Sequence, residues 1–284
     1  MIKTFRLLKS VITMRVNSGF TEENGIIKCI DFEKIPFISH GFTTKEGGVS
    51  KGVYFSCNLG LSCDEPFENV LENYNIVARK IGFDAKRLVL TKQVHSDKAV
   101  RVTEKDCGNR LFGKGEVVEC DALVTNEKNV PIGVFTADCT PILMCDTEQK
   151  VVAAVHSGWK GTLSEIGKNT LALMQNEFGT KPEDVKALIG PSIKKCHFEV
   201  KNDVYSLFCE KFGKSFIDSV TDIKGESFYI DTDSINVKSL VSAGLKEENI
   251  SLCPRCTFCE NDKFFSHRAS GGVAGRQCAF IVIK

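Results

Sequence analysis

Residues 131–161 read PIGVFTADCTPILMCDTEQKVVAAVHSGWKG, and two short apolar runs in this stretch each lead to polar residues. The run 132–135 leads to Cys139, and the run 151–155 ends at His156. Short apolar runs bounded by turn residues are typical of buried strands. Binding sites are commonly built from polar residues just beyond the ends of such strands. Cys139 and His156 are 17 positions apart, which leaves room for a strand and a tight return, so we expect the two side chains to meet.

The segments on either side alternate between helical and extended patterns. Residues 67–81 have helical spacing and stop at Gly82, which is a typical helix end. Further helices are expected at 164–178, 204–212 and 234–243, and further strands at 88–90, 185–189 and 278–283. Strands clustered in the middle of the chain with helices between them indicate an α/β or α+β fold.

The composition is that of a globular protein with a substantial core. The chain has 284 residues, of which 42% are hydrophobic and 26% charged. A net charge of +1 provides no electrostatic footprint for nucleic acid or a membrane surface. No repeat or long linker interrupts the sequence, so residues 1–284 are expected to form a single domain, with 1–24 as a leader that is a strand or frayed.

The first residues do not have the pattern of a secretion signal. Lys3, Arg6 and Lys9 interrupt every apolar stretch, so there is no h-region. No window approaches the roughly 20 apolar residues of a membrane span. We therefore expect a cytoplasmic protein, in which the thirteen cysteines are reduced thiols rather than disulfides.

Histidine is scarce, and this narrows the choice of metal chemistry. A multicopper oxidase needs about ten histidines for its copper centres, and this chain has five. His95, Cys139 and His156 provide a set of three ligands that would leave zinc one open position, as in catalytic sites. The alternative is that they are unrelated polar residues at strand ends.

The same residues also fit a cysteine nucleophile. Cys139 and His156 would then be the nucleophile and its base, oriented by Asp138 or Gln93. Such pairs are also assembled from positions that are distant in sequence. Spacing alone leaves the metal site and the nucleophile pair both open.

The stretch CPRCTFC at 253–259 contains two overlapping C-x-x-C spacings. Cys253, Cys256 and Cys259 are candidates for a structural zinc site with His267 as the fourth ligand. No second C-x-x-C follows, so a loop of reduced thiols is the favoured interpretation.

The turn 158–161, GWKG, lies between an expected strand and an expected helix. Its backbone N–H groups could bind an anion at the helix start. It is far from a phosphate-loop sequence, and tight packing of the strand on the helix explains the glycines equally well.

Taken together, these stretches resemble the family known as multicopper polyphenol oxidase-like, laccase-domain or purine nucleoside phosphorylase proteins. The resemblance spans about residues 35–284 and rests on eight ordered motifs: GFTTKEGGVS, CNLG, TKQVHSD, CDALVTN, GVFTADCTPILMCD, AAVHSGWKGT, IGPSIKKCHFEV and FFSHRASGGVAGRQ. Eight motifs in order make the match specific.

The resemblance implies a layered α/β/β/α sandwich, within the α+β class, and one zinc per chain held by two histidines and one cysteine. Position by position these ligands are His95, Cys139 and His156. The same set would also accommodate copper, although not a multicopper centre.

The activities implied are phosphorolysis of adenosine, inosine and methylthioadenosine, and deamination of adenosine. The expected partners are a purine nucleoside and phosphate, with no nucleic acid or membrane. The alternatives are a cysteine or zinc hydrolase that edits a peptidoglycan precursor, and a non-catalytic metal-binding module.

Within that interpretation five further residues have expected roles. Asp138 is the expected proton shuttle, because it adjoins the cysteine ligand. Lys45 and Arg268 would hold phosphate or developing charge, and Asn58 and Gln93 would orient the substrate.

The chain departs from the family pattern at three positions. Lys45 replaces an arginine, which removes a bidentate fork and keeps the charge. Tyr74 stands where an arginine is usual, and His197 occupies an aromatic position of the C-aromatic-E-V element.

Overall fold

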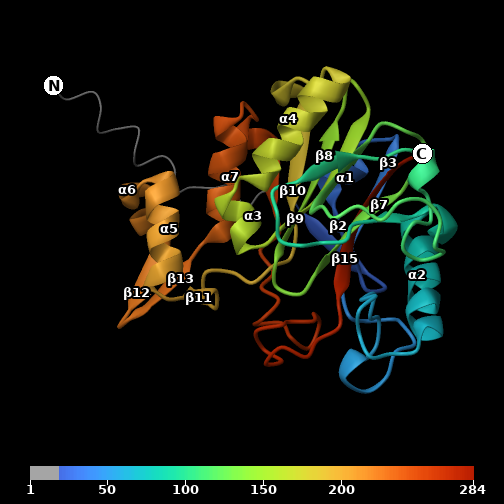
Figure 1. The fold of residues 1–284 in the computed structure, drawn as a ribbon, viewed down its shortest axis with the longest axis horizontal. Helices are drawn as coiled ribbons and strands as arrows, with labels where there is room; N and C mark the ends of the chain where they lie inside the picture. The colour runs from blue at the N-terminus through green and yellow to red at the C-terminus, as the bar shows by residue number, and fades with distance from the viewer. Residues whose placement is uncertain (1–18) are drawn as a thin grey trace.

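The structure is a computed structural model that describes residues 19–284 (Figure 1). Its strands form two six-stranded sheets and one three-stranded sheet. The first sheet has the order β1 (Phe20–Glu23), β2 (Ile26–Cys29), β3 (Ile38–Thr43), β15 (Gln277–Ile283), β7 (Ile132–Thr136) and β4 (Val89–Leu90). The second has the order β14 (Ile250–Leu252), β10 (Val185–Ile189), β8 (Thr140–Asp146), β9 (Val151–Ser157), β6 (Ala122–Thr125) and β5 (Ala99–Arg101). The third has the order β11 (Glu199–Val200), β13 (Ser227–Ile230) and β12 (Thr221–Lys224).

The described residues also form seven α-helices and several 3-10 turns. The helices are α1 (Ile30–Glu33), α2 (Phe67–Ile81), α3 (Trp159–Leu163), α4 (Ile166–Phe178), α5 (Asn202–Phe212), α6 (Lys214–Ser219) and α7 (Thr232–Ser242). The 3-10 turns are Gly52–Tyr54, Ala85–Arg87, Glu104–Asp106, Pro182–Asp184 and Glu247–Asn249. None of these helices is long and apolar enough to cross a lipid bilayer.

The two large sheets pack face to face and are covered by helices on their outer faces. Alternation along β15 shows how this arises, because successive side chains of a strand point to opposite faces. Ala279 and Ile281 join the core between the sheets, whereas Cys278 and Phe280 pack in the cluster beneath α2. In β8 the alternation places every second residue in the cluster beneath α4 and α7. The layers are thus α2, sheet, sheet, and α4 with α7, which confirms the predicted α/β/β/α sandwich (Figure 1).

Both faces of these strands are covered, and this explains the unbroken apolar runs in the sequence. All seven residues of β8 and all seven of β9 are buried. The helix predicted at 67–81 matches α2, which ends at Gly82 with a φ of 93°. The helix predicted at 164–178 matches α4 but begins two residues later, because Glu165 has a φ of 57° and separates α4 from α3.

β1 takes up residues 20–23 of the expected leader, and residues 1–18 of it lie outside the described residues. All thirteen cysteines lie within the described residues, and each is a free thiol.

His40 is a buried histidine of β3 that lies apart from the metal-ligand candidates. Its side chain is 2% exposed, and its Nε2 accepts the backbone N–H of Cys29 at 3.0 Å. A ring nitrogen that accepts a hydrogen bond carries no proton, so this contact requires neutral imidazole. Burial, helped by Lys28 and Lys284, lowers the pKa of His40 to about 3.

We expect His40 to make the free energy of unfolding depend on pH. The pKa is about 6.5 in an unfolded chain, so between pH 6.5 and about 3 the unfolded state binds the extra proton. Its stabilising contribution is complete above pH 6.5 and decreases with acidification, by about 2 kcal/mol from pH 7 to pH 5. Urea unfolding of metal-free protein at several pH values measures this. His40→Gln should flatten the dependence by that amount, and an unchanged slope would show that His40 is not its source.

Candidate metal centre and its surroundings

Strand pairing brings two of the three predicted ligands together. In the antiparallel pair of β8 and β9, Thr140 lies opposite Ser157 and Pro141 opposite His156. Cys139, directly before β8, is therefore next to the end of β9 that carries His156. The stretch that suggested the fold thus also places half-buried Cys139 beside buried His156.

His95 reaches the same point from the segment after β4. Its Nε2 lies 3.9 Å from the Cys139 Sγ, and its ring meets that of His156 edge-on with the centroids 4.9 Å apart. The ligand atoms of His95, Cys139 and His156 all lie within 4.8 Å of one another. This arrangement is a candidate metal centre that would use one thiolate and two imidazoles.

Asp121 organises this centre, although the sequence did not single it out. The side chain is fully buried, and its carboxylate accepts the backbone N–H groups of Val94, His95 and Ser96 at 3.2, 3.0 and 2.7 Å. It also lies 2.9 Å from the Nδ1 of His156. One carboxylate therefore fixes the His95 segment and orients His156. Its only sequence signal was a polar residue at the start of the buried strand 122–125, in the motif CDALVTN.

The contact with Asp121 also sets the tautomer of His156. An ionised carboxylate only accepts hydrogen bonds, so the Nδ1 of His156 carries a proton and Nε2 is the ring nitrogen that would bind a metal. Carboxylate partners orient metal-binding histidines in this way in many proteins. Burial raises the pKa of Asp121, but hydrogen bonds from His156 and Ser96 outweigh it and lower the pKa to about 2.

The thiol and imidazole of the centre shift each other's pKa. Burial raises the pKa of Cys139, but His156 and His95 outweigh it and lower the pKa to about 6. Burial lowers the pKa of His156, but Cys139 and Asp121 outweigh it and raise the pKa to about 9. The geometry thus favours a thiolate at Cys139, the form that binds metals and also the form that acts as a nucleophile.

The space at the centre depends on Gly158. A Cβ at this position would lie 2.8 Å from the His95 ring and 3.3 Å from the Cys139 Sγ. A Cβ at Gly161 would lie 3.3 Å from Ile166 and 3.4 Å from a backbone carbonyl. Close packing therefore accounts for the glycines of the GWKG turn, where the five-residue helix α3 begins. The two imidazoles, the thiolate and the glycine-lined gap together fit a bound metal.

Backbone strain is concentrated beside the ligands. His95 has a φ of 58° and Asp138 a φ of 88°, a region that non-glycine residues seldom adopt. Such conformations persist where the surrounding contacts hold them, and they cluster at functional sites.

Asp138 is buried and connects the centre to two other segments. Its Oδ1 accepts the Thr257 hydroxyl and its Oδ2 the backbone N–H of Arg268, both at 2.7 Å. The Arg268 guanidinium donates to the backbone carbonyls of His197 and Glu199. The proton-shuttle role of Asp138 stays a prediction, as does the charge-holding role of Arg268.

The side chains of Asn58 and Gln93 form hydrogen bonds within the chain. The Asn58 Oδ1 accepts the backbone N–H groups of Gly60 and Arg276, and its Nδ2 donates to Glu65. Gln93 exchanges hydrogen bonds with the backbone of Phe135 at 2.6 and 2.9 Å. These contacts position loops, and the expected substrate contacts of both residues stay predictions.

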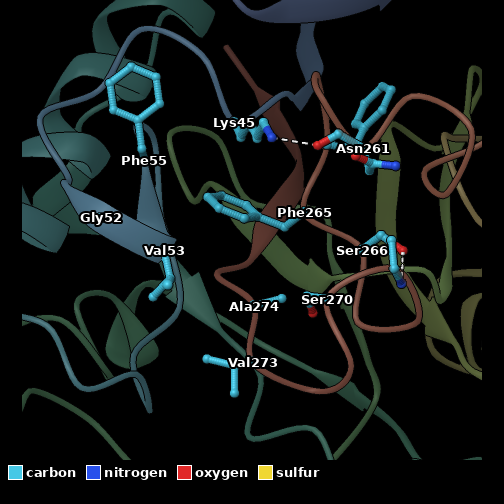
Figure 2. Close-up of a pocket in the computed structure, with 12 residues that line it drawn as sticks. Lys45, Gly52, Val53, Phe55, Asn261, Phe265, Ser266, Ser270, Val273 and Ala274 are labelled. Carbon is cyan, nitrogen blue, oxygen red and sulfur yellow. Dashed lines mark hydrogen bonds between the residues drawn. The ribbon is translucent and has the colours of Figure 1, made fainter.

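Lys45 lines a cavity of about 360 Å³ (Figure 2). Its Nζ donates to the backbone carbonyl of Asn261 across the cavity wall. The remaining lining mixes apolar side chains with polar groups and comprises Gly52, Val53, Phe55, Phe264, Phe265, Ser266, Ala269, Ser270, Val273 and Ala274. The cavity wall includes Ser266 and Ala269, near Arg268 in the sequence, and the backbone N–H of Arg268 donates to Asp138.

The family position that usually holds an arginine is part of the core in this chain. Tyr74 is fully buried, and its hydroxyl donates to the backbone carbonyl of Leu59 at 2.7 Å. Residue 74 therefore supplies no charge to the site.

The sequence matches the family model described as multi-copper polyphenol oxidoreductase laccase over residues 39–284. It is 32% identical to the purine nucleoside phosphorylase YlmD of Bacillus subtilis, over 86% of this chain and 88% of the relative. It is also 32% identical to adenosine deaminase RL5 from an unknown prokaryotic organism, over 87% of this chain and 97% of the relative. The crystal structure of YlmD from Geobacillus stearothermophilus superposes with a TM-score of 0.87 at 31% identity, covering 93% of this chain and 98% of that one.

Proposed function

The chain belongs to the multi-copper polyphenol oxidoreductase laccase family, and we propose that it is a zinc-dependent purine nucleoside phosphorylase with adenosine deaminase activity. The observation that carries the proposal is the meeting of His95, Cys139 and His156 around a glycine-lined gap. The names of the two relatives above give the two reactions. Five histidines remain too few for multicopper chemistry, despite the family description.

His95, Cys139 and His156 would hold the zinc, with Asp121 behind the second histidine. When bound, zinc supplies a Lewis acid that polarises an oxygen of the reactants. One thiolate and two imidazoles suit zinc, and they also suit copper. Metal analysis of the purified protein would identify the ion.

The cavity at Lys45 is the proposed place for the nucleoside and phosphate. Its apolar side chains suit a purine ring, and its polar groups would fix the orientation of the sugar and anion. Lys45 contributes a positive charge at the wall, which favours an anionic nucleophile.

Phosphorolysis and deamination both require a proton to be transferred. In phosphorolysis a phosphate oxygen bonds to C1′ of the ribose, and the base leaves with the electron pair of the broken C1′–N9 bond and takes up a proton. In deamination water replaces the amino group, which leaves as ammonia after gaining a proton. Asp138 adjoins Cys139 and is the proposed carrier in each case.

Product analysis on adenosine, with and without phosphate, tests the proposed function. Adenine and ribose 1-phosphate should form only with phosphate, and inosine should form in both conditions. Turnover no faster than that of Cys139→Ala would support a non-catalytic metal-binding module.

The structure also keeps a cysteine hydrolase as a second candidate, because Cys139 lies in direct contact with two imidazoles. The two candidates respond differently to inhibitors. Chelation should abolish a zinc-dependent reaction and spare a cysteine nucleophile, whereas chelated enzyme that stays active until alkylated would favour the hydrolase.

Lys45→Ala should separate the two activities. Losing one charge-assisted contact costs about 1.5–3 kcal/mol, so phosphorolysis should fall by roughly 10-fold or more, or the phosphate KM should rise. Deamination in phosphate-free buffer should fall much less, because it needs no cation for phosphate.

Steady-state assays of adenine, hypoxanthine and inosine release would measure both reactions. Lys51→Ala is the matched control, since it removes an exposed lysine six positions away that does not line the cavity. Equal losses in both reactions would mean that Lys45 shapes the nucleoside site, and no loss would mean that it is an ordinary surface lysine.

A further inference from the structure

A second group of metal-ligand side chains lies at the junction of the three-stranded sheet and the C-terminal loops. It contains Cys196, His197, Cys256 and Cys259, whose ligand atoms all lie within 4.8 Å of one another. These residues come from two segments about 60 positions apart, IKKCHFEV and CPRCTFC. The group is separate from His95, Cys139 and His156, and it does not depend on the proposed function.

We propose that Cys196, His197, Cys256 and Cys259 form a second, structural zinc site. Three thiolates and one imidazole are a complete tetrahedral ligand set, which leaves no open position and so marks a structural rather than a catalytic site. The protein would then hold two zinc ions per chain rather than the one expected from the sequence.

The distances within the group match the edges of a tetrahedron around zinc. Zn–S bonds of about 2.3 Å at tetrahedral angles place sulfur atoms about 3.8 Å apart. The Cys196 Sγ lies 3.6 Å from that of Cys256 and 3.7 Å from that of Cys259. The Nδ1 of His197 lies 3.2 Å from the Cys196 Sγ and 3.3 Å from the Cys259 Sγ. All four atoms thus surround a space of the size of one zinc ion.

The ligands are held in place by the backbone around them. The Cys256 sulfur accepts backbone N–H groups from Lys194, Phe258 and Cys259. Such hydrogen bonds stabilise thiolate charge. A bridge between Ser192 and Cys256 pairs the two segments.

The imidazole is oriented by stacking. The ring of His197 lies on that of Phe258 with the centroids 4.0 Å apart and an interplanar angle of 18°. This contact turns Nδ1 toward Cys196 and Cys259. Cys196 and Cys259 are exposed and His197 is half-buried, so a metal could enter from solvent.

The structure changes the zinc hypothesis for the CPRCTFC loop. Cys256 and Cys259 belong to the group, but Cys253 and His267 do not. The other two ligands are Cys196 and His197 instead. Thr257, between two of the ligands, donates to Asp138 beside the first centre. A zinc at the second site would therefore also steady a contact of the candidate active site.

Zinc content measured in the Cys139→Ala background tests the proposal, because that change removes the first site. Full-length protein purified under reducing conditions, incubated with zinc and desalted should keep one zinc per chain. Adding Cys259→Ser should remove it, while adding Cys253→Ser should not, because Cys253 shares the loop but not the group. Loss of zinc from Cys139→Ala/Cys259→Ser, with zinc retained by Cys139→Ala/Cys253→Ser, would confirm the site.

His197→Phe provides a variant with little risk to folding, since phenylalanine keeps the stacking on Phe258 and removes only the ligand nitrogen. Competition with a chromophoric chelator should show zinc affinity weakened by more than the 10–100-fold that loss of an outer-shell partner costs. Cobalt-loaded Cys139→Ala protein should show thiolate-to-cobalt charge-transfer absorption, which Cys259→Ser should diminish.

Two results would overturn the proposal. One is Cys139→Ala protein that is folded, has Cys196, Cys256 and Cys259 as reduced thiols, and still retains no zinc. The other is a mass two hydrogens lower with a disulfide mapped between group cysteines and no bound metal, which would make the group a redox pair.

Discussion

Replacing Cys139 by alanine is expected to remove one metal ion per chain and to lower nucleoside phosphorolysis about 10³-fold or more. The thiolate is the only anionic ligand among His95, Cys139 and His156, so its loss removes both a bond and charge compensation. A Lewis-acid metal supplies several kcal/mol of transition-state stabilisation, and each 1.4 kcal/mol corresponds to a factor of ten in rate. Metal content and the rate of adenine release would be measured on the same preparation.

Cys209→Ala is the control for this experiment, because Cys209 is a half-buried free thiol on α5 outside both ligand groups. It should retain wild-type metal content and rate. A Cys139→Ala protein with undiminished metal content would contradict the assignment of the first centre. Full activity of that variant would exclude Cys139 both as a ligand needed for catalysis and as a nucleophile.

Asp121→Asn is expected to weaken metal binding at the first centre by about 10–100-fold, the cost of losing an outer-shell carboxylate. The carboxylate holds the Nδ1 of His156 and three consecutive backbone N–H groups that begin at Val94. An amide has fewer acceptor sites and adds donors, so some of these buried groups would lose a partner, at about 1–3 kcal/mol each. The melting temperature should therefore fall together with metal affinity.

Chelator competition and thermal unfolding, with and without added zinc, would measure both effects. Asp97→Asn is the matched control, because Asp97 is an exposed carboxylate in the same segment. Excess zinc should restore much of the activity of Asp121→Asn, since the three ligands remain. Unchanged metal affinity would mean that Asp121 only stabilises the fold.

Local sequence patterns determined the elements that build the layers. The helical spacing of 67–81, ended by Gly82, predicted the bounds of α2, and the run 151–155 predicted the body of β9. The apolar run marked β9 as buried because both faces of its sheet are covered. The pattern at 164–178 missed the break at Glu165, since a positive φ at a glutamate has no periodic signature.

The sequence also predicted His95, Cys139 and His156 as one ligand set, through ordered motifs and through polar residues just past strand ends. The structure brings these three side chains together because β8 and β9 pair with Thr140 opposite Ser157.

Only the tertiary structure decided which residues support and accompany that set. Asp121 matters because one buried carboxylate meets the backbone of residues 94–96 and the ring of His156, and no local pattern encodes such a convergence. The cysteine spacing within 253–259 suggested a zinc site with His267 as the fourth ligand. The actual neighbours, Cys196 and His197, come from a segment about 60 residues earlier. Periodicity reports which face of an element is buried, whereas contacts between distant segments depend on how the layers and loops pack, and the packed chain alone specifies them.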